Sequence, residues 1–308
     1  HMQIFRHLCT TAELKTAQTE WHFQLERAEM GADYLSRHPA RFERAWRNAL
    51  LQLYRLLLMP LSRVLTAPRL LVIPYGSLHL LPFHALWDGQ QFMLEQFEFV
   101  YAPSASLAVR TQTQQITRPG WHSWAGLAIT DPAIPAARQE VETAARHFPQ
   151  AWLYLDEAAN RANLHVAARQ ADILHLATHG LFRPDNAFFS GLKLADGWVD
   201  VREIYRLVLR ARMVVLSACE SGAGQIRGGD EVIGLARGFL GAGVHSLLVS
   251  LWNVHDASSA LFMDRFYRAL TADPATSTPS AALRIAQLAA IAQQQHPYYW
   301  ASFFIIGA

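Results

Sequence analysis

The sequence predicts an α/β fold in which a mostly parallel central sheet is covered by helices on both faces, a three-layer arrangement. Short apolar runs alternate with helical patterns from residue 69 onwards. These runs are almost continuously apolar, which is typical of strands that are buried on both faces. Hydrophobic residues make up 51% of the 308 positions, which is enough for a sizeable core.

Two helices are expected ahead of the sheet. Apolar residues recur at helical spacing over 10–37, and Pro39 interrupts that pattern. A second helix is expected over 41–58, and Pro60 ends or kinks it. We therefore expect three parts in the chain, namely a cloning remnant at 1–2, a helical extension over 3–38 and a larger α/β domain over 39–308.

The sheet region is expected to contain eight main strands and five helices. The strands are expected at 69–74, 97–102, 124–130, 151–155, 172–178, 211–218, 244–252 and within 298–308. The helices are expected at 136–148, 160–169, 231–241, 256–270 and 280–295. A hairpin is expected over 191–201, because Asp196-Gly197 separates two short apolar runs.

Composition excludes several classes of protein. The 27 basic and 25 acidic side chains leave a formal charge of +2, which argues against a dedicated nucleic-acid surface. No run of eighteen uninterrupted apolar residues is present, so we expect no membrane span. The only two cysteines, Cys9 and Cys219, cannot form a disulfide framework, and this favours a reducing, cytoplasmic setting.

Two of the expected strands end in side chains that carry chemistry. His179 and Gly180 follow the run at 172–178, and Cys219 follows the run at 211–218. In a parallel sheet, sites gather beyond the carboxyl ends of the strands. A histidine and a cysteine on neighbouring strand ends can approach each other, and the imidazole then helps to generate the nucleophilic thiolate. The alternative for Cys219 is a small buried hydrophobic residue, and the paired histidine favours the reactive interpretation.

Neither a metal nor a cofactor is expected. His175 and His179 are four residues apart, but they lie on a strand rather than a helix, so we interpret His175 as a hydrogen-bonded residue of that strand. The glycine-rich segment 221–231 carries Arg227 where a dinucleotide fingerprint needs glycine, and it lacks a P-loop. We interpret that segment as a flexible loop beside a cleft.

The motifs ATHG at 177–180 and SACESG at 217–222 resemble the two signature motifs of the CHAT domain. This caspase-like peptidase domain belongs to the clan of caspases and separase. The resemblance covers roughly residues 40–308, and further segments that carry it lie at 73–89, 101–109, 229–256, 262–270 and 298–308.

The resemblance implies a caspase-like α/β/α sandwich and a cysteine endopeptidase. Cys219 would attack the scissile carbonyl, and His179 would act as general base and then as general acid. The backbone N–H groups of Gly180 and Cys219 would form the oxyanion hole. Ser217 and Glu220 depart from the caspase motif, so cleavage after aspartate is not implied.

Substrate preference leaves alternatives open. Asp256 lies in a segment that resembles the separase stretch that recognises a basic residue before the cut, but it also suits a cap of a helix starting near Ala257. Glu220, Asp230 and Glu231 are further acidic candidates for substrate binding. Asp131, just before Pro132, is typical of a turn or a helix cap.

The resemblance also implies partners. The expected partners are a protein substrate and a regulatory tetratricopeptide-repeat domain or activator upstream, with no nucleic acid and no membrane. Residues 3–38 would be either the end of such a repeat array or an integral extension of the peptidase. A regulated switch such as bacterial defence or programmed cell death is the implied setting. The alternative is a catalytically silent caspase-like module that binds peptides or partner proteins, and the presence of both His179 and Cys219 favours the enzyme.

Overall fold

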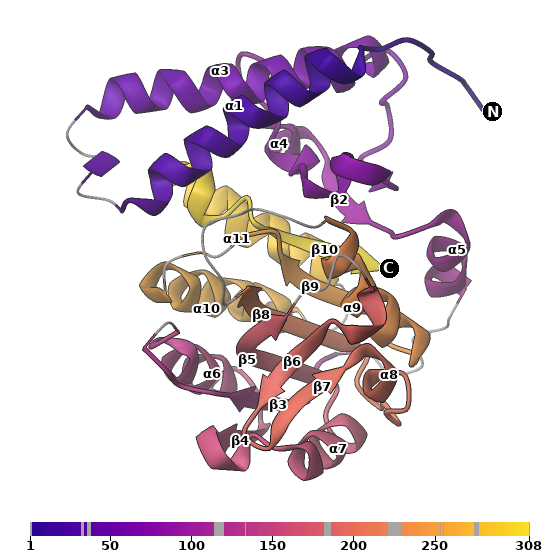
Figure 1. Ribbon diagram of the computed structural model, residues 1–308, viewed down its shortest axis with the longest axis vertical. Coiled ribbons are helices and arrows are strands. Elements are labelled where there is room, and N and C mark those ends of the chain that lie inside the picture. Colours follow the sequence, from indigo (N-terminus) through magenta and orange to yellow (C-terminus); the bar gives the residue numbers. More distant parts are fainter. Residues whose placement is uncertain are drawn as a thin grey trace.

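The computed structural model describes residues 2–31, 34–35, 38–113, 120–132, 134–181, 186–220, 229–252, 254, 256–273 and 277–307. At a few of these positions, including 218–220, 230–233 and 256–257, the backbone alone is described. Within this part of the chain, one twisted sheet lies between two layers of helices, as Figure 1 shows. The three-layer α/β arrangement expected from the sequence is therefore confirmed.

The main path of the sheet runs in the order β1-β2-β10-β9-β8-β5-β3-β4. These strands are β1 (Arg69–Val72), β2 (Glu98–Tyr101), β3 (Ser123–Ala128), β4 (Gln150–Leu155), β5 (Ile173–Leu181), β8 (Met213–Glu220), β9 (Ser246–Ser250) and β10 (Phe303–Gly307). Neighbouring strands from β4 to β9 along this path pair in parallel. The pairing of β10 with β9 is antiparallel, whereas β10, β2 and β1 are again parallel to one another. The sheet is thus mostly parallel, as expected.

The central strands are mostly apolar and almost entirely buried, because both of their faces are covered. All six residues of β3 are buried, and only Leu181, the last residue of β5, is partly exposed. The expected hairpin is present as β6 (Gly191–Leu194) and β7 (Gly197–Asp200). Its first strand pairs with the end of β5, beyond the point where β3 stops.

One helical layer comprises α6 (Ala137–Ala145), α10 (Asp256–Ala272) and α11 (Pro279–Ala292). In Figure 1 these three helices lie on the left of the sheet, where α10 packs between the other two. The opposite layer comprises α5 (Ala105–Thr113), α7 (Arg161–Gln170), α8 (Val201–Ile204) and α9 (Gly229–Gly241). Among the described residues, no helix is long and apolar enough to cross a lipid bilayer.

Several short elements were not expected from the sequence. They are α4 (Met93–Gln96), α5, α8 and the 3₁₀ turns η1 (Met59–Leu61), η2 (Gly76–Leu80), η3 (Phe83–Ala85), η4 (Asp156–Ala158), η5 (Ala187–Phe189) and η6 (Pro297–Tyr299). Most of them span three to five residues, too few for a hydrophobic period to be visible.

The two N-terminal helices form a hairpin at the top of Figure 1. They are α1 (Thr11–Glu29), which starts with a capping box between Thr10 and Glu13, and α3 (Pro39–Leu57), which has a proline in its first turn. The first helix is shorter than the expected 10–37. Trp21 is fully buried, and its ring lies edge-on to that of Trp252 with centroids 6.0 Å apart. The buried face of α1 therefore belongs to the same hydrophobic core as the sheet.

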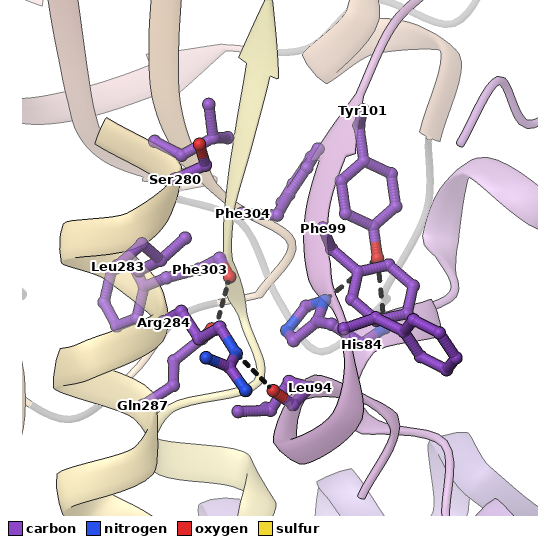
Figure 2. Close-up of a pocket in the computed structure, with 12 residues that line it drawn as sticks. His84, Leu94, Phe99, Tyr101, Ser280, Leu283, Arg284, Gln287, Phe303 and Phe304 are labelled. Atoms are coloured by element: carbon purple, nitrogen blue, oxygen red, sulfur yellow. Dashed lines mark hydrogen bonds between the residues drawn. The ribbon is translucent and has the colours of Figure 1, made fainter. Parts of the chain in front are cut away.

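Two buried polar side chains, those of His84 and Gln287, make hydrogen bonds where α11 packs on β2 and β10. Figure 2 shows the His84 ring beside the Tyr101 hydroxyl, with 2.9 Å between Nδ1 and the oxygen. The Gln287 amide donates to the Phe303 carbonyl at 2.9 Å. Burial lowers the pKa of His84 to about 3, so this ring is neutral in the folded protein. The small cavity among these residues has a volume of about 10 Å³, which is room for a single water molecule.

Candidate active site

The ends of three parallel strands meet at one edge of the sheet. β5 and β8 pair in a register that sets His179 opposite Cys219 and Gly180 opposite Glu220. Neighbouring strands lie about 5 Å apart, so His179 and Cys219 are close neighbours at this edge. Because residues in register on parallel strands share a face of the sheet, both belong to the face that α6 and α10 cover.

The imidazole of His179 is buried and has a carboxylate partner. Only 9% of the residue is exposed, and its Nε2 contacts the carboxylate of Asp131. Asp131 lies in the turn after β3, where the Ile134 N–H donates to its carbonyl at 3.1 Å. Sequence reasoning assigned Asp131 to a turn and missed its contact with His179. Asp131 follows the end of a third strand, and this position could have identified it as a candidate for the site.

The turn that carries Asp131 is held by a second carboxylate. Asp156, just after β4, accepts the backbone N–H of Thr130 at 2.9 Å and Nη2 of Arg138 at 2.6 Å. These two donors hold the pKa of Asp156 below its ordinary value, and the backbone bond from Thr130 has the largest effect. Asp156 adopts a φ of +52°, a left-handed conformation that aspartate tolerates better than most residues. Asp156 thereby contacts residues on both sides of the Asp131 turn, Thr130 before it and Arg138 after it.

A buried polar network lies beneath the two strand ends. Glu140 of α6 is 4% exposed, and its carboxylate accepts from Nε2 of His175 at 2.9 Å and from the Ser217 hydroxyl at 3.1 Å. The Tyr267 hydroxyl lies 3.0 Å from Nδ1 of His175. Burial raises the pKa of the Tyr267 phenol, so the hydroxyl keeps its proton and donates it to that nitrogen. His175 is thus a hydrogen-bonded residue of its strand, as interpreted from the sequence.

The β6–β7 hairpin borders the site on the side of β3. Gly180 is in register with Leu192 of β6, and the Thr178 hydroxyl donates to the Lys193 carbonyl. Gly191 starts the hairpin where no side chain fits, because a Cβ there would lie 2.7 Å from the Val199 carbonyl oxygen. A glycine at this position lets the hairpin close against the end of β5.

The remaining candidates from the sequence lie near the same edge. Glu220 ends β8, Asp230 is in the first turn of α9, and Asp256 is the first residue of α10. The side chains of these three residues, of Glu231 and of Cys219 lie outside the described part of the structure, as do residues 221–228 of the expected loop. Trp252, after β9, is buried and donates its indole N–H to the Tyr298 carbonyl at 2.9 Å.

Metal ligands do not cluster in the described residues. No group of three or more histidine, cysteine, aspartate or glutamate side chains within the described ranges is arranged to hold a metal ion. The cavity beside His84 is lined from β2, β10 and α11 rather than from the strand ends, and it is too small for a substrate. At the described edge, His179 and its carboxylate partner lie beside the cysteine position that the register sets opposite the histidine.

Comparison with known structures shows the same fold in two solved proteins. The Arg-specific cysteine proteinase gingipain R superposes with a TM-score of 0.57 at 10% identity, over 97% of this chain and 75% of that chain. A chain of the Saccharomyces cerevisiae separase–securin complex superposes with a TM-score of 0.51 at 19% identity, over 74% of this chain and 15% of that chain. These likenesses confirm the caspase-like α/β/α fold.

Sequence comparison gives relatives that are much longer than this chain. Tetratricopeptide repeat protein 28 of Homo sapiens is 24% identical over 298 aligned residues, which cover 78% of this chain and only 12% of that protein. Its Mus musculus counterpart is 33% identical over 107 residues, which cover 34% of this chain and 4% of that protein. The sequence profile of the CHAT domain matches residues 47–308, most of the chain. The protein therefore belongs to the CHAT domain family, as the motifs around His179 and Cys219 led us to expect.

Proposed function

We propose that this protein is a cysteine endopeptidase that cleaves a protein substrate with Cys219 as nucleophile and His179 as general base and acid. The observation that carries the proposal is the β5–β8 register, which pairs these two residues on adjacent strand ends. Thiols are mostly protonated at neutral pH, and a neighbouring imidazole is the usual means of generating the thiolate.

The proposed reaction proceeds in two stages. The Cys219 thiolate attacks the scissile carbonyl carbon while His179 holds the thiol proton, and that proton passes to the leaving amine as the C–N bond breaks. A water molecule then gives a proton to His179 and attacks the thioester, which releases the acid and restores the thiol. Backbone N–H groups of Gly180 and Cys219 are the proposed oxyanion donors, and each such donor contributes on the order of 3 kcal/mol. Gly180 has no side chain to obstruct the approach of a substrate to its backbone.

We further propose cleavage after a basic residue, with Asp256 as the carboxylate that pairs with it. Asp256 starts α10, which follows β9 at the same edge of the sheet as the end of β8. One protein of the same fold, gingipain R, is an Arg-specific proteinase. Glu220 and Asp230 are the further acidic candidates at this edge. The alternative role for Asp256 is to stabilise the N-terminus of α10, in whose first turn it lies.

The partners form part of the proposal. The named sequence relatives are tetratricopeptide repeat proteins, of which this chain spans a small share, and this supports a repeat domain as the regulator of the peptidase. The proposal also retains a helical extension over 3–38 and a catalytic domain over 39–308. A regulated cytoplasmic switch, such as one in bacterial defence, is the setting that we propose for the cleavage.

Digestion of a peptide library tests the proposal. The wild type and a Cys9→Ser control are expected to cleave the same peptides, whereas Cys219→Ala and His179→Ala are expected to cleave none. Asp256→Asn is expected to weaken the preference for arginine or lysine before the cut, and an unchanged preference would return Asp256 to its helical role. Cleavage that persists in Cys219→Ala contradicts the proposed nucleophile. Peptides that bind the wild type without being cut would instead favour the silent binding module.

A further inference from the structure

We infer that Asp131 is a positioning residue that holds the His179 ring so that Nδ1 is the nitrogen that exchanges a proton with Cys219. The inference deepens the proposed function and rests on it for the role of Cys219. It assigns a third member to the site, and it also assigns the reactive atom of the histidine.

The contact between the two side chains determines which nitrogen carries the proton. The Asp131 carboxylate contacts Nε2 of His179, and an ionised carboxylate only accepts hydrogen bonds. Nε2 therefore carries the hydrogen in the neutral ring. A neutral imidazole has one protonated nitrogen and one free lone pair, so the lone pair is on Nδ1. Nδ1 is then the atom available to hold the thiol proton.

The strand order explains why a residue after β3 reaches His179. The chain places β4 on one side of β3 and β5 on the other, so the strand order reverses between β3 and β5. Crevices in such sheets open beyond the carboxyl ends of the strands at this reversal. Asp131 follows β3 and His179 lies at the end of β5, so their contact lies at the reversal.

The turn that carries Asp131 is built to hold a fixed position. Ile129 donates its N–H to the Ala177 carbonyl at 3.1 Å, which ties the start of the turn to β5 two residues before His179. The Asp156 carboxylate accepts hydrogen bonds from the neighbouring Thr130 N–H at 2.9 Å and from the Arg138 guanidinium at 2.6 Å. Asp131 is therefore held from β5 on one side and from the end of β4 on the other. A carboxylate that orients a catalytic ring needs such support, because a displacement of about 1 Å costs much of the rate.

The charge of the pair also suits the proposed reaction. When His179 takes the proton from the thiol, the ring becomes positive and the carboxylate at Nε2 stabilises it. The side chain of His179 is 11% exposed and that of Asp131 is 35% exposed, so water screens the attraction only partly. A carboxylate held by the histidine is poorly placed to bind a basic substrate side chain, which makes specificity a weaker role for Asp131.

The test uses ¹⁵N NMR of the full chain with labelled histidines at a pH where His179 is neutral. The wild type is expected to show His179 with hydrogen on Nε2 and a free Nδ1, and His179→Gln identifies its signals among the 14 histidines. Asp131→Asn is expected to populate the other tautomer. The matched control is Asp264→Asn, because Asp264 contacts Nε2 of His147 at 2.8 Å in a second histidine–aspartate pair outside the site. This control should leave the His179 signals unchanged.

Kinetics supply the second measurement. Asp131→Asn is expected to lower kcat by about 10²- to 10⁴-fold with little change in KM, as the loss of an orienting carboxylate does in other triads. Asp156→Asn, which loosens the turn without touching His179, is expected to shift both the tautomer signal and kcat in the same direction by less. This second variant keeps the test decisive if Asp131→Asn does not fold.

The two proposals fail in different ways. A His179 tautomer that Asp131→Asn and Asp156→Asn both leave unchanged overturns the positioning role, whatever the activity. A rise in KM at constant kcat also overturns it, because Asp131 would then bind substrate. A tautomer shift in a protein whose wild type cleaves no peptide supports the role of Asp131 in orienting the ring and counts against the proposed peptidase alone.

Discussion

Glu140 is the residue whose replacement should most disturb the structure beneath the site. Its carboxylate is the acceptor for two groups on different strands, Nε2 of His175 in β5 and the hydroxyl of Ser217 in β8. Ser217 lies two residues before Cys219, and His175 lies four residues before His179. Glu140 therefore bridges α6 to both strands that carry the proposed dyad.

Replacing Glu140 with alanine leaves both of these donors without their acceptor. Each polar group that loses its buried partner costs about 1–3 kcal/mol. Glu140 is only 4% exposed, so water does not readily take the place of its carboxylate. We expect Glu140→Ala to lower the free energy of unfolding by about 2–6 kcal/mol, which is the sum for two such groups.

Glu140→Gln separates hydrogen bonding from charge. The amide oxygen of glutamine can accept from His175, and its NH₂ group can donate to the oxygen of Ser217. Both contacts then survive in neutral form, and the expected loss is about 1–2 kcal/mol because charged hydrogen bonds are stronger than neutral ones. Glu142, two residues further along the same helix, is the control. Its side chain is 41% exposed, and its Oε1 lies 3.8 Å from Nη1 of Arg138. Because exposed ion pairs contribute little, Glu142→Ala should change the free energy of unfolding by less than about 0.5 kcal/mol.

Urea unfolding followed by tryptophan fluorescence measures all three variants at pH 7. The expected order of stability is Glu142→Ala, then Glu140→Gln, then Glu140→Ala, with similar urea dependence throughout. A loss below about 1 kcal/mol for Glu140→Ala would refute the reasoning, since the two orphaned groups alone should exceed it.

Three further predictions concern stability. Burial lowers the pKa of His84 from 6.5 to about 3, so the unfolded chain takes up a proton at this residue between those values and the native state does not. The free energy of unfolding should therefore fall as the pH drops below 6.5. Between pH 6 and 4.5, His84→Gln should make this fall less steep by about 1.4 kcal/mol per pH unit. Equal pH dependence of the wild type and His84→Gln in urea unfolding would contradict this. Trp21→Ala should cost about 3–5 kcal/mol by urea unfolding, because the indole is fully buried against Trp252, whereas a loss under about 1 kcal/mol would mean that α1 is dispensable to the core. Gly191→Ala should cost about 1–3 kcal/mol, because its Cβ would lie 2.7 Å from the Val199 carbonyl oxygen, and an unchanged melting temperature would show that the hairpin moves freely.

The sequence was sufficient to predict the layers and most of the strands. The central strands β3, β5 and β8 are buried on both faces, so their apolar runs stand out without any knowledge of the fold. The strand-end rule also pointed to His179 and Cys219, because each follows such a run directly. The family motifs added the expected roles, which local pattern alone does not supply.

Other features depend on contacts between distant segments. Asp131 reaches His179 only because β3 and β5 are neighbours, and strand order is a property of the whole sheet. Glu140 occupies an ordinary helical position, and its burial follows from the packing of α6 against β5 and α10. The antiparallel pairing of β10 with β9 likewise cannot be predicted from the local sequence, since the apolar pattern of a strand does not depend on the direction of its partner.

The account as a whole depends on a thiol and an imidazole acting together, and alkylation by iodoacetamide tests this without any substrate. Cys9 serves as an internal reference in the same chain, because burial, with a contribution from Glu13, raises the pKa of its thiol and should keep its alkylation slow near pH 7. Mass spectrometry of the modified peptides gives both rates from one reaction. We predict that Cys219 reacts faster than Cys9 in the wild type and that His179→Ala slows Cys219 severalfold while leaving Cys9 unchanged. Equal Cys219 rates in the wild type and His179→Ala would contradict the account.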